Sequence, residues 1–212
     1  IHLATVQICI NSVSVEMLEV KNNDILNDAR KSIYKAIIYI EEVVTNTVDC
    51  PYSELETKQN KIEHYTVDRR YELVKKLGLV IDMLVDAFGD NSKWKESFVE
   101  LRGRFVVVAK NMLDMRTGYK AYFEPGEPFH EETVLYVRLV RSLLDKSATE
   151  YRDRYELASR RIDDMRTAVN LLIAARRIAM VLGDSEGSEE IRKKALVWKT
   201  KMETDQKAGI SK

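Results

Sequence analysis

The sequence is poor in the two residues that most often interrupt helices. Only 8 glycines and 3 prolines occur among its 212 residues. An all-β fold needs many tight turns, and glycine and proline supply a large share of them. Their scarcity therefore argues against an all-β fold and predicts long helices.

Cysteine is also scarce. Cys9 and Cys50 are the only two cysteines, and they form no C-x-x-C pair. A chain of this length with two cysteines is no disulfide scaffold, so we expect two thiols in a reducing compartment and a cytoplasmic location. Because the sequence begins with Ile1 rather than Met, a second interpretation stays open. The chain would then be an excised domain or a processed product whose export signal has been removed.

Neither sign of charge dominates. Lysine plus arginine and aspartate plus glutamate both number 34, so the formal net charge is zero. This balance gives no general attraction to nucleic acids or to anionic membranes. The lack of any run of 18 apolar residues predicts no transmembrane segment. The hydrophobic content of 45% is nevertheless enough for a core and excludes a disordered chain.

The common motifs of catalysis and cofactor binding are missing as well. The sequence has no G-x-S-x-G elbow, no Walker loop and no dinucleotide-binding glycine loop. Glu127 and His130 have E-x-x-H spacing, but Pro128 lies between them, and a di-iron site needs a second such motif. We therefore predict no catalytic residue, no metal ligand and no cofactor, and we expect that the protein is not an enzyme.

The sequence does contain a regular alternation of four- and three-residue steps between apolar residues. The first stripe consists of Leu3, Val6, Ile10, Val13, Met17 and Val20, and the clearest one consists of Trp94, Phe98, Leu101, Phe105, Val108, Met112 and Met115. Such stripes predict amphipathic helices that bury one face at small crossing angles. A tight turn at residues 21–24, with Asn23 or Asp24 as N-cap, predicts a helical hairpin. Gly78 on an apolar face predicts the close approach of a neighbouring helix.

No glycine or proline interrupts the long stretch from residue 131 to residue 182. As one helix it would be about 78 Å long at 1.5 Å per residue, and Lys146-Ser147 is the expected break if it forms two helices. Together the stripes predict an all-α fold, an elongated antiparallel bundle of about six to seven helices with coiled-coil-like 4-3 packing. We expect a single domain over residues 1–212. Residues 1–118 and 131–208 are possible sub-units, joined by the 119–130 loop.

The stretch from Gly118 to His130 holds two of the three prolines and four aromatic residues. Proline and glycine predict an irregular loop, and a loop of this length in a helical bundle is often functional. Because aromatic side chains anchor protein interfaces, we predict a set of partner-binding residues consisting of Tyr119, Tyr122, Phe123, Glu124, Phe129 and His130. In the alternative, the aromatic side chains fold back and plug the end of the core. The solvent exposure of Tyr119, Tyr122 and Phe123 distinguishes the two.

Arginines form the second group of candidate residues. Those that we consider for contact with an anion or an acidic partner are Arg141, Arg160, Arg161, Arg176 and Arg177. Arg141 and Arg176 fall on apolar positions, where a charge must be paired, extend to the edge of the buried stripe, or mark an open surface. Acidic residues such as Asp163 and Asp164 are interleaved among the arginines, and this mixture is typical of a solvated helix surface.

We predict a non-enzymatic protein-protein interaction or scaffold protein. Its partner would be another protein or a second copy of the chain. One alternative is a helical protein that binds nucleic acid or phosphate through Arg-rich helices; nucleic acid is possible but not favoured. This nucleic-acid alternative predicts salt-sensitive binding to DNA or RNA that disappears when Arg160 and Arg161 are neutralised. The other alternative is a helical enzyme whose site the sequence does not reveal, which would need a deep polar pocket.

Overall fold

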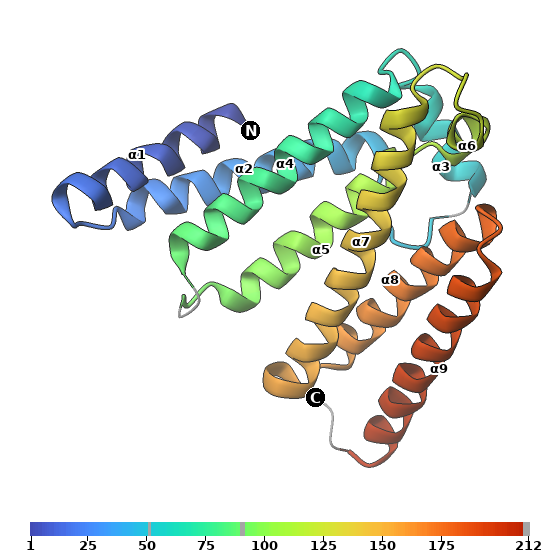
Figure 1. Ribbon diagram of the computed structural model, residues 1–212. Helices are drawn as coiled ribbons and strands as arrows, with labels where there is room; N and C mark the ends of the chain where they lie inside the picture. The colour runs from blue at the N-terminus through green and yellow to red at the C-terminus, as the bar shows by residue number, and fades with distance from the viewer. Residues whose placement is uncertain (51, 90–91, 210–212) are drawn as a thin grey trace. The chain divides into compact units, whose positions relative to one another are not determined.

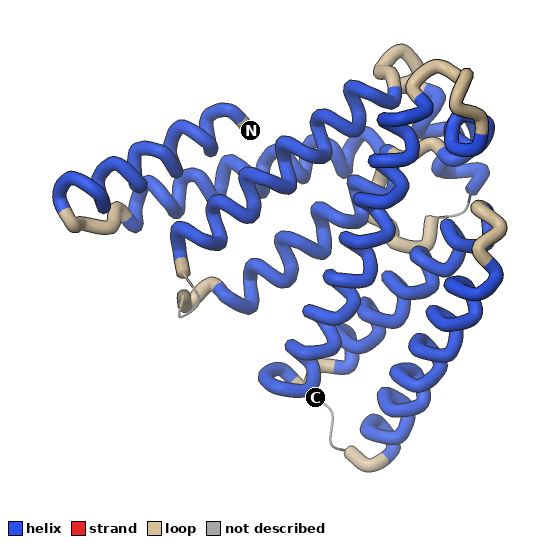
Figure 2. Tube along the Cα trace, in the orientation of Figure 1, coloured by secondary structure: helices blue, strands red, loops and turns tan. Residues whose placement is uncertain are grey.

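The computed structural model describes residues 1–50, 52–89 and 92–209. These residues form nine α-helices, one π-helical turn and no strand, which confirms the predicted all-α fold (Figure 1, Figure 2). The predicted count of about six to seven helices is not confirmed for this part of the chain. A short helix over residues 115–123 and an unpredicted chain reversal at residue 160 account for the difference from seven.

The chain divides into two compact units. The N-terminal unit comprises residues 1–46, 52–89 and 92–114, and the C-terminal unit comprises residues 47–50 and 115–209. The N-terminal unit contains α1 (His2–Leu18), α2 (Asn23–Val44), α3 (Tyr52–Asn60), α4 (Val67–Phe88) and α5 (Lys95–Met112). The C-terminal unit contains α6 (Met115–Phe123), α7 (His130–Arg154), the π-helical turn η1 (Tyr155–Ser159), α8 (Ile162–Val181) and α9 (Ser185–Lys207). The single domain over residues 1–212 stays a prediction.

In the N-terminal unit, α2 packs against α1, α4 and α5. α2 begins after Asn22, whose side-chain oxygen accepts a hydrogen bond from the backbone N–H of Ile25 at 3.1 Å. The N-cap thus lies one residue before the predicted Asn23 or two before Asp24. The backbone N–H of Asn22 donates to Oδ1 of Asn11 at 2.9 Å, which ties the turn to α1.

α4 and α5 approach each other closely at Gly78, as the sequence predicts. A Cβ atom at this position would lie 3.1 Å from Cζ of Phe105. Side chains in protein cores rarely pack so tightly, so the missing Cβ makes room for the ring.

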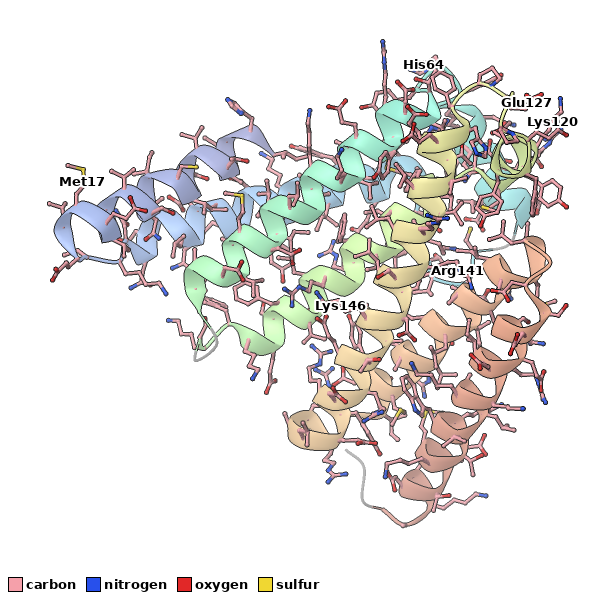
Figure 3. All side chains as sticks on the ribbon, viewed as in Figure 1. Met17, His64, Lys120, Glu127, Arg141 and Lys146 are labelled. Atoms are coloured by element: carbon pink, nitrogen blue, oxygen red, sulfur yellow. The ribbon has the colours of Figure 1, made fainter. Side chains whose placement is uncertain are left out.

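The apolar stripe of α1 is not buried, which contradicts the prediction. All six of its members are between 42% and 76% exposed: Leu3, Val6, Ile10, Val13, Met17 and Val20. α1 instead packs on α2 and α4 with buried residues that include Ala4 and Ile8. Ile8 and Met17 are nine residues apart and therefore lie on opposite sides of the helix at 100° per residue. Met17, labelled in Figure 3, points away from α2 and α4.

In the C-terminal unit, α8 packs between α7 and α9 and runs antiparallel to both (Figure 1). The predicted break at Lys146-Ser147 is wrong, because Ser147 is buried within α7. The chain reverses after η1, at Arg160, whose φ of 52° lies in the left-handed region. Its backbone N–H donates to the carbonyl oxygen of Tyr155 at 3.1 Å. Helices that end with a left-handed residue usually have glycine there, so the sequence contains no signal that the helix ends at this arginine.

Candidate interaction site at the α6–α7 corner

The α6–α7 corner, residues 115–133, contains all of the predicted partner-binding residues. Its first part is not a loop as predicted, because residues 115–123 form α6 and only residues 124–129 are irregular. Gly118 does not end a helix. It is buried within α6, where a Cβ would meet Cγ2 of Thr133 in α7 at 3.4 Å. The glycine lets α6 lie close against α7, and the loop begins only where the prolines begin.

Two polar contacts hold the loop in place. Nζ of Lys120 forms an ion pair with the carboxylate of Glu127, and these residues are labelled in Figure 3. Glu127 and, to a smaller extent, Glu124 raise the pKa of Lys120. Nδ1 of His130 lies 2.7 Å from the carbonyl oxygen of Ala121, so Nδ1 must carry a proton to donate this hydrogen bond. His130, predicted to bind a partner, therefore also links α7 to α6.

Aromatic side chains cluster on α6. The ring centroids of Tyr119 and Phe123 are 5.0 Å apart, and those of Tyr122 and Phe123 are 4.9 Å apart, both in edge-on geometry. Tyr119 and Phe123 are each 49% exposed, whereas Tyr122 is half-buried. Because half of their surface faces solvent, Tyr119 and Phe123 do not plug the core.

Phe129 adds a further exposed ring at the start of α7. Its side chain is 43% exposed, and its φ of 61° lies in the left-handed region that bulky residues rarely adopt. This conformation costs on the order of 1 kcal/mol or more. Oγ1 of the buried Thr133 donates to the carbonyl oxygen of Phe129 at 2.7 Å, which helps to hold the strained residue.

Arg141, the first of the candidate arginines, is paired within its own unit. Its guanidinium donates to Oδ2 of Asp184 at 2.6 Å (Arg141 is labelled in Figure 3). Asp184 is the N-cap of α9 and accepts a hydrogen bond from the backbone N–H of Gly187 at 2.9 Å. The Gly187 N–H and then Arg141 lower the pKa of Asp184. The charge at this apolar position is thus balanced by a carboxylate of the same chain.

The remaining candidate arginines lie at the two ends of α8. Arg160 and Arg161 are exposed at its N-terminal end, and α8 separates Arg161 from Arg177 by about 24 Å at 1.5 Å per residue. Arg177 forms an ion pair with Asp49, and Nε of the half-buried Arg176 has no hydrogen-bond partner among the described residues. The five arginines therefore do not form one patch.

A buried polar cluster that the sequence pattern did not predict lies at the α7–α8 reversal. The hydroxyl of Tyr155 donates to Oδ2 of Asp205 at 2.8 Å, and both residues are buried. Burial, followed by this hydrogen bond, raises the pKa of Tyr155 to about 12. The nearby carboxylate of Asp164 accepts hydrogen bonds from Arg154 and from Oγ of Ser159. A protonated tyrosine and paired carboxylates suit a structural role at the reversal better than nucleophilic catalysis.

Across residues 1–50, 52–89 and 92–209, no group of three or more His, Cys, Asp or Glu side chains is arranged to hold a metal ion. Within the same ranges, no helix combines the length and apolar content that crossing a membrane requires.

The chain matches the model of a known protein family. Searches of curated proteins and of solved structures each find no similar chain. A family model, described as the TP0443 family, matches residues 1–206 and thus includes both units, with α6, the α6–α7 corner and almost all of α9. The chain therefore belongs to the TP0443 family.

Proposed function

We propose that this protein is a non-enzymatic interaction or scaffold protein and that its α6–α7 corner binds another protein. The observation that carries the proposal is the pair of exposed rings of Tyr119 and Phe123, packed edge-on with each other and with the half-buried Tyr122. Burying such rings at an interface removes apolar surface from water and contributes more than most other contacts. We keep the cytoplasmic location and the coiled-coil-like 4-3 packing as parts of this proposal.

The surroundings of the cluster support binding to a protein. The ion pair of Lys120 with Glu127 and the hydrogen bond of His130 to Ala121 restrict the loop before any partner arrives. A restricted loop loses less conformational entropy on binding. The exposed Lys120 and Glu124 beside the rings match the usual anatomy of an interface, in which a polar rim surrounds an apolar centre.

Photo-cross-linking in cells that naturally produce the protein tests this proposal. Tyr119 is replaced by p-benzoylphenylalanine, and the control carries the same group at Leu196 of α9, which is 55% exposed. We expect a discrete adduct with one other protein from position 119 and none from position 196. The adduct should disappear when Phe123→Ser is added, because the paired ring is then lost. Equal adducts from both positions, or none from position 119, would contradict the proposal.

A second candidate function is binding of nucleic acid or phosphate at Arg160 and Arg161. These side chains are exposed where α8 begins, and a helix N-terminus favours anions. Asp163 and Asp164 occupy the same first turn and oppose an anion there. Fluorescence anisotropy with duplex DNA and single-stranded RNA at low salt decides between the functions. Binding that is lost in Arg160→Gln/Arg161→Gln would favour this candidate.

A further inference from the structure

α1 has a continuous apolar face that its own unit does not cover. Within α1 the stripe from Leu3 to Met17 is exposed, while Ala4 and Ile8 on the other side make the contact with α2 and α4. Soluble proteins rarely expose contiguous apolar surface of this kind unless it binds something. We propose that this face binds the same face of a second copy of the chain, in an antiparallel α1–α1 pair. The inference rests on the proposed interaction function and identifies one partner.

The spacing of the stripe suits pairing about a two-fold axis. Within α1, which ends at Leu18, the steps from Val6 to Met17 are 4-3-4, which is the same series in both directions. An axis between Asn11 and Ser12 therefore places Ile10 opposite Val13 of the second copy. The outer pair, Val6 with Met17 of the second copy, follows in the same way.

The charges of α1 favour the antiparallel direction and a protein partner. Residues 1–20 contain no lysine or arginine, and the acidic residues Glu16 and Glu19 both lie at the C-terminal end. A parallel pair would bring the glutamates of the two copies together, whereas an antiparallel pair places them at opposite ends. Helices that bind anionic membranes are rich in Lys and Arg, so a second copy fits this face better than a lipid surface does.

The size of the face predicts a dimer that depends on concentration. Six roughly half-exposed aliphatic side chains offer on the order of 400 Å² of apolar surface per copy. Since dimer interfaces are about 65% apolar, the whole interface would be roughly 600 Å² per copy. Standard stable interfaces bury about 800 Å² per partner, so the α1 pair lies at the lower end of this class.

Sedimentation equilibrium of the full chain over a wide concentration range tests the pairing. We expect wild type to approach twice the mass of one chain at high concentration. Ile10→Glu should weaken the dimer at least about 100-fold, because it places a carboxylate at the apolar centre of the interface. The control Leu196→Glu, at a similarly exposed apolar residue of α9, should leave the dimer unchanged. Both positions are exposed, so circular dichroism should show that both variants fold.

A charge exchange tests the direction of the pair. In the antiparallel arrangement, position 10 of one copy faces position 13 of the other. Val13→Lys alone should therefore dissociate the dimer, and Ile10→Glu/Val13→Lys should restore much of it. A parallel pair would place like charges together and would stay dissociated in the double variant.

Several results would overturn the inference. One is wild type that stays monomeric at every concentration, and another is a dimer that resists Ile10→Glu. A third is a monomer that sediments with vesicles of phosphatidylcholine and phosphatidylglycerol through this face, which would assign it to lipid. The Tyr119 cross-link separates this inference from the proposed function. If that adduct persists while no dimer forms, only the inference fails; if the dimer behaves as expected but the adduct is missing, only the corner proposal fails.

Discussion

α1 and α5 have the same 4-3 apolar repeat but opposite surroundings. The stripe of α5 is buried from Phe98 to Met112, and α5 also buries residues on its other sides. The stripe of α1 is exposed from Leu3 to Val20. Periodicity therefore identifies the apolar face of a helix, but it does not show what covers that face.

The difference arises because α1 has two faces with 4-3 spacing. The second one contains Ala4, Ile8 and Asn11, all buried, in steps of four and three. Asn11 makes this face look polar in the sequence, yet its side chain accepts the hydrogen bond from Asn22 that closes the α1–α2 turn. A short, partly polar face thus makes the internal contact, and the longer apolar face is left free.

The largest expected difference between α1 and α5 is in the free energy of unfolding that is lost when one leucine of each stripe is truncated. Leu101→Ala should lower the free energy of unfolding by about 3 kcal/mol, because Leu101 is fully buried and a cavity remains. Leu3→Ala, on the exposed stripe, should change it by no more than about 0.5 kcal/mol. Urea unfolding at concentrations too low for dimerisation measures both values. Equal losses would contradict the comparison.

A buried and an exposed arginine of the N-terminal unit should also differ in how much they contribute to stability. Arg70 donates to the carbonyl oxygens of Tyr65 at 2.6 Å, Ile62 at 2.7 Å and Met112 at 3.2 Å. Arg70→Ala should destabilise the chain by about 3 kcal/mol, because these acceptors lose a charged donor. Its exposed neighbour provides the control, and Arg69→Ala should cost less than about 0.5 kcal/mol. Thermal unfolding followed by circular dichroism measures both, and similar midpoints would refute this role.

In the C-terminal unit, the buried Tyr155 should make stability depend on alkaline pH. Its folded pKa of about 12 lies above the value of about 10 in an unfolded chain, so folding favours the protonated hydroxyl. This contribution is complete below about pH 10 and is lost as pH rises from about 10 to 12. Tyr155→Phe should cost about 1 kcal/mol at neutral pH. Urea unfolding between pH 9 and 12 should show wild type losing more stability than the variant; parallel losses would disprove the linkage.

The smallest effect is expected at the α4–α5 contact. Gly78→Ala gains about 1 kcal/mol of helix propensity but forces the ring of Phe105 to move. The two effects oppose each other, so the net change should stay within about 1 kcal/mol. A loss above 3 kcal/mol in chemical denaturation would mean that the ring cannot shift.

Much of the secondary structure could be predicted, because local patterns determine it. The all-α class, the α1–α2 hairpin and the close approach at Gly78 all follow from spacing and helix propensity. The reversal at Arg160 could not be predicted, because a non-glycine residue adopts the left-handed conformation there. The helical conformation of residues 119–123 was missed because Gly118 serves packing against α7 rather than helix termination.

The candidate site was predicted in composition but not in geometry. The aromatic residues of the α6–α7 corner were identified, but their exposure and the contact of His130 with Ala121 depend on how α6 packs. Arg141 was recognised as unusual, but its partner Asp184 lies 43 residues away in the chain. Contacts over such distances arise from tertiary structure, which local patterns do not contain.

The most direct test of an uncovered α1 face compares two substitutions to glutamate in dilute, monomeric protein. Circular dichroism follows helix content and thermal unfolding of Ile10→Glu and Leu101→Glu. We predict that Ile10→Glu keeps the helix content and unfolding midpoint of the wild-type monomer, whereas Leu101→Glu does not fold, because it would bury a charge in the core. If Ile10→Glu loses its helical signal as Leu101→Glu does, the chain itself covers the α1 stripe, and both the comparison and the α1 pair are wrong.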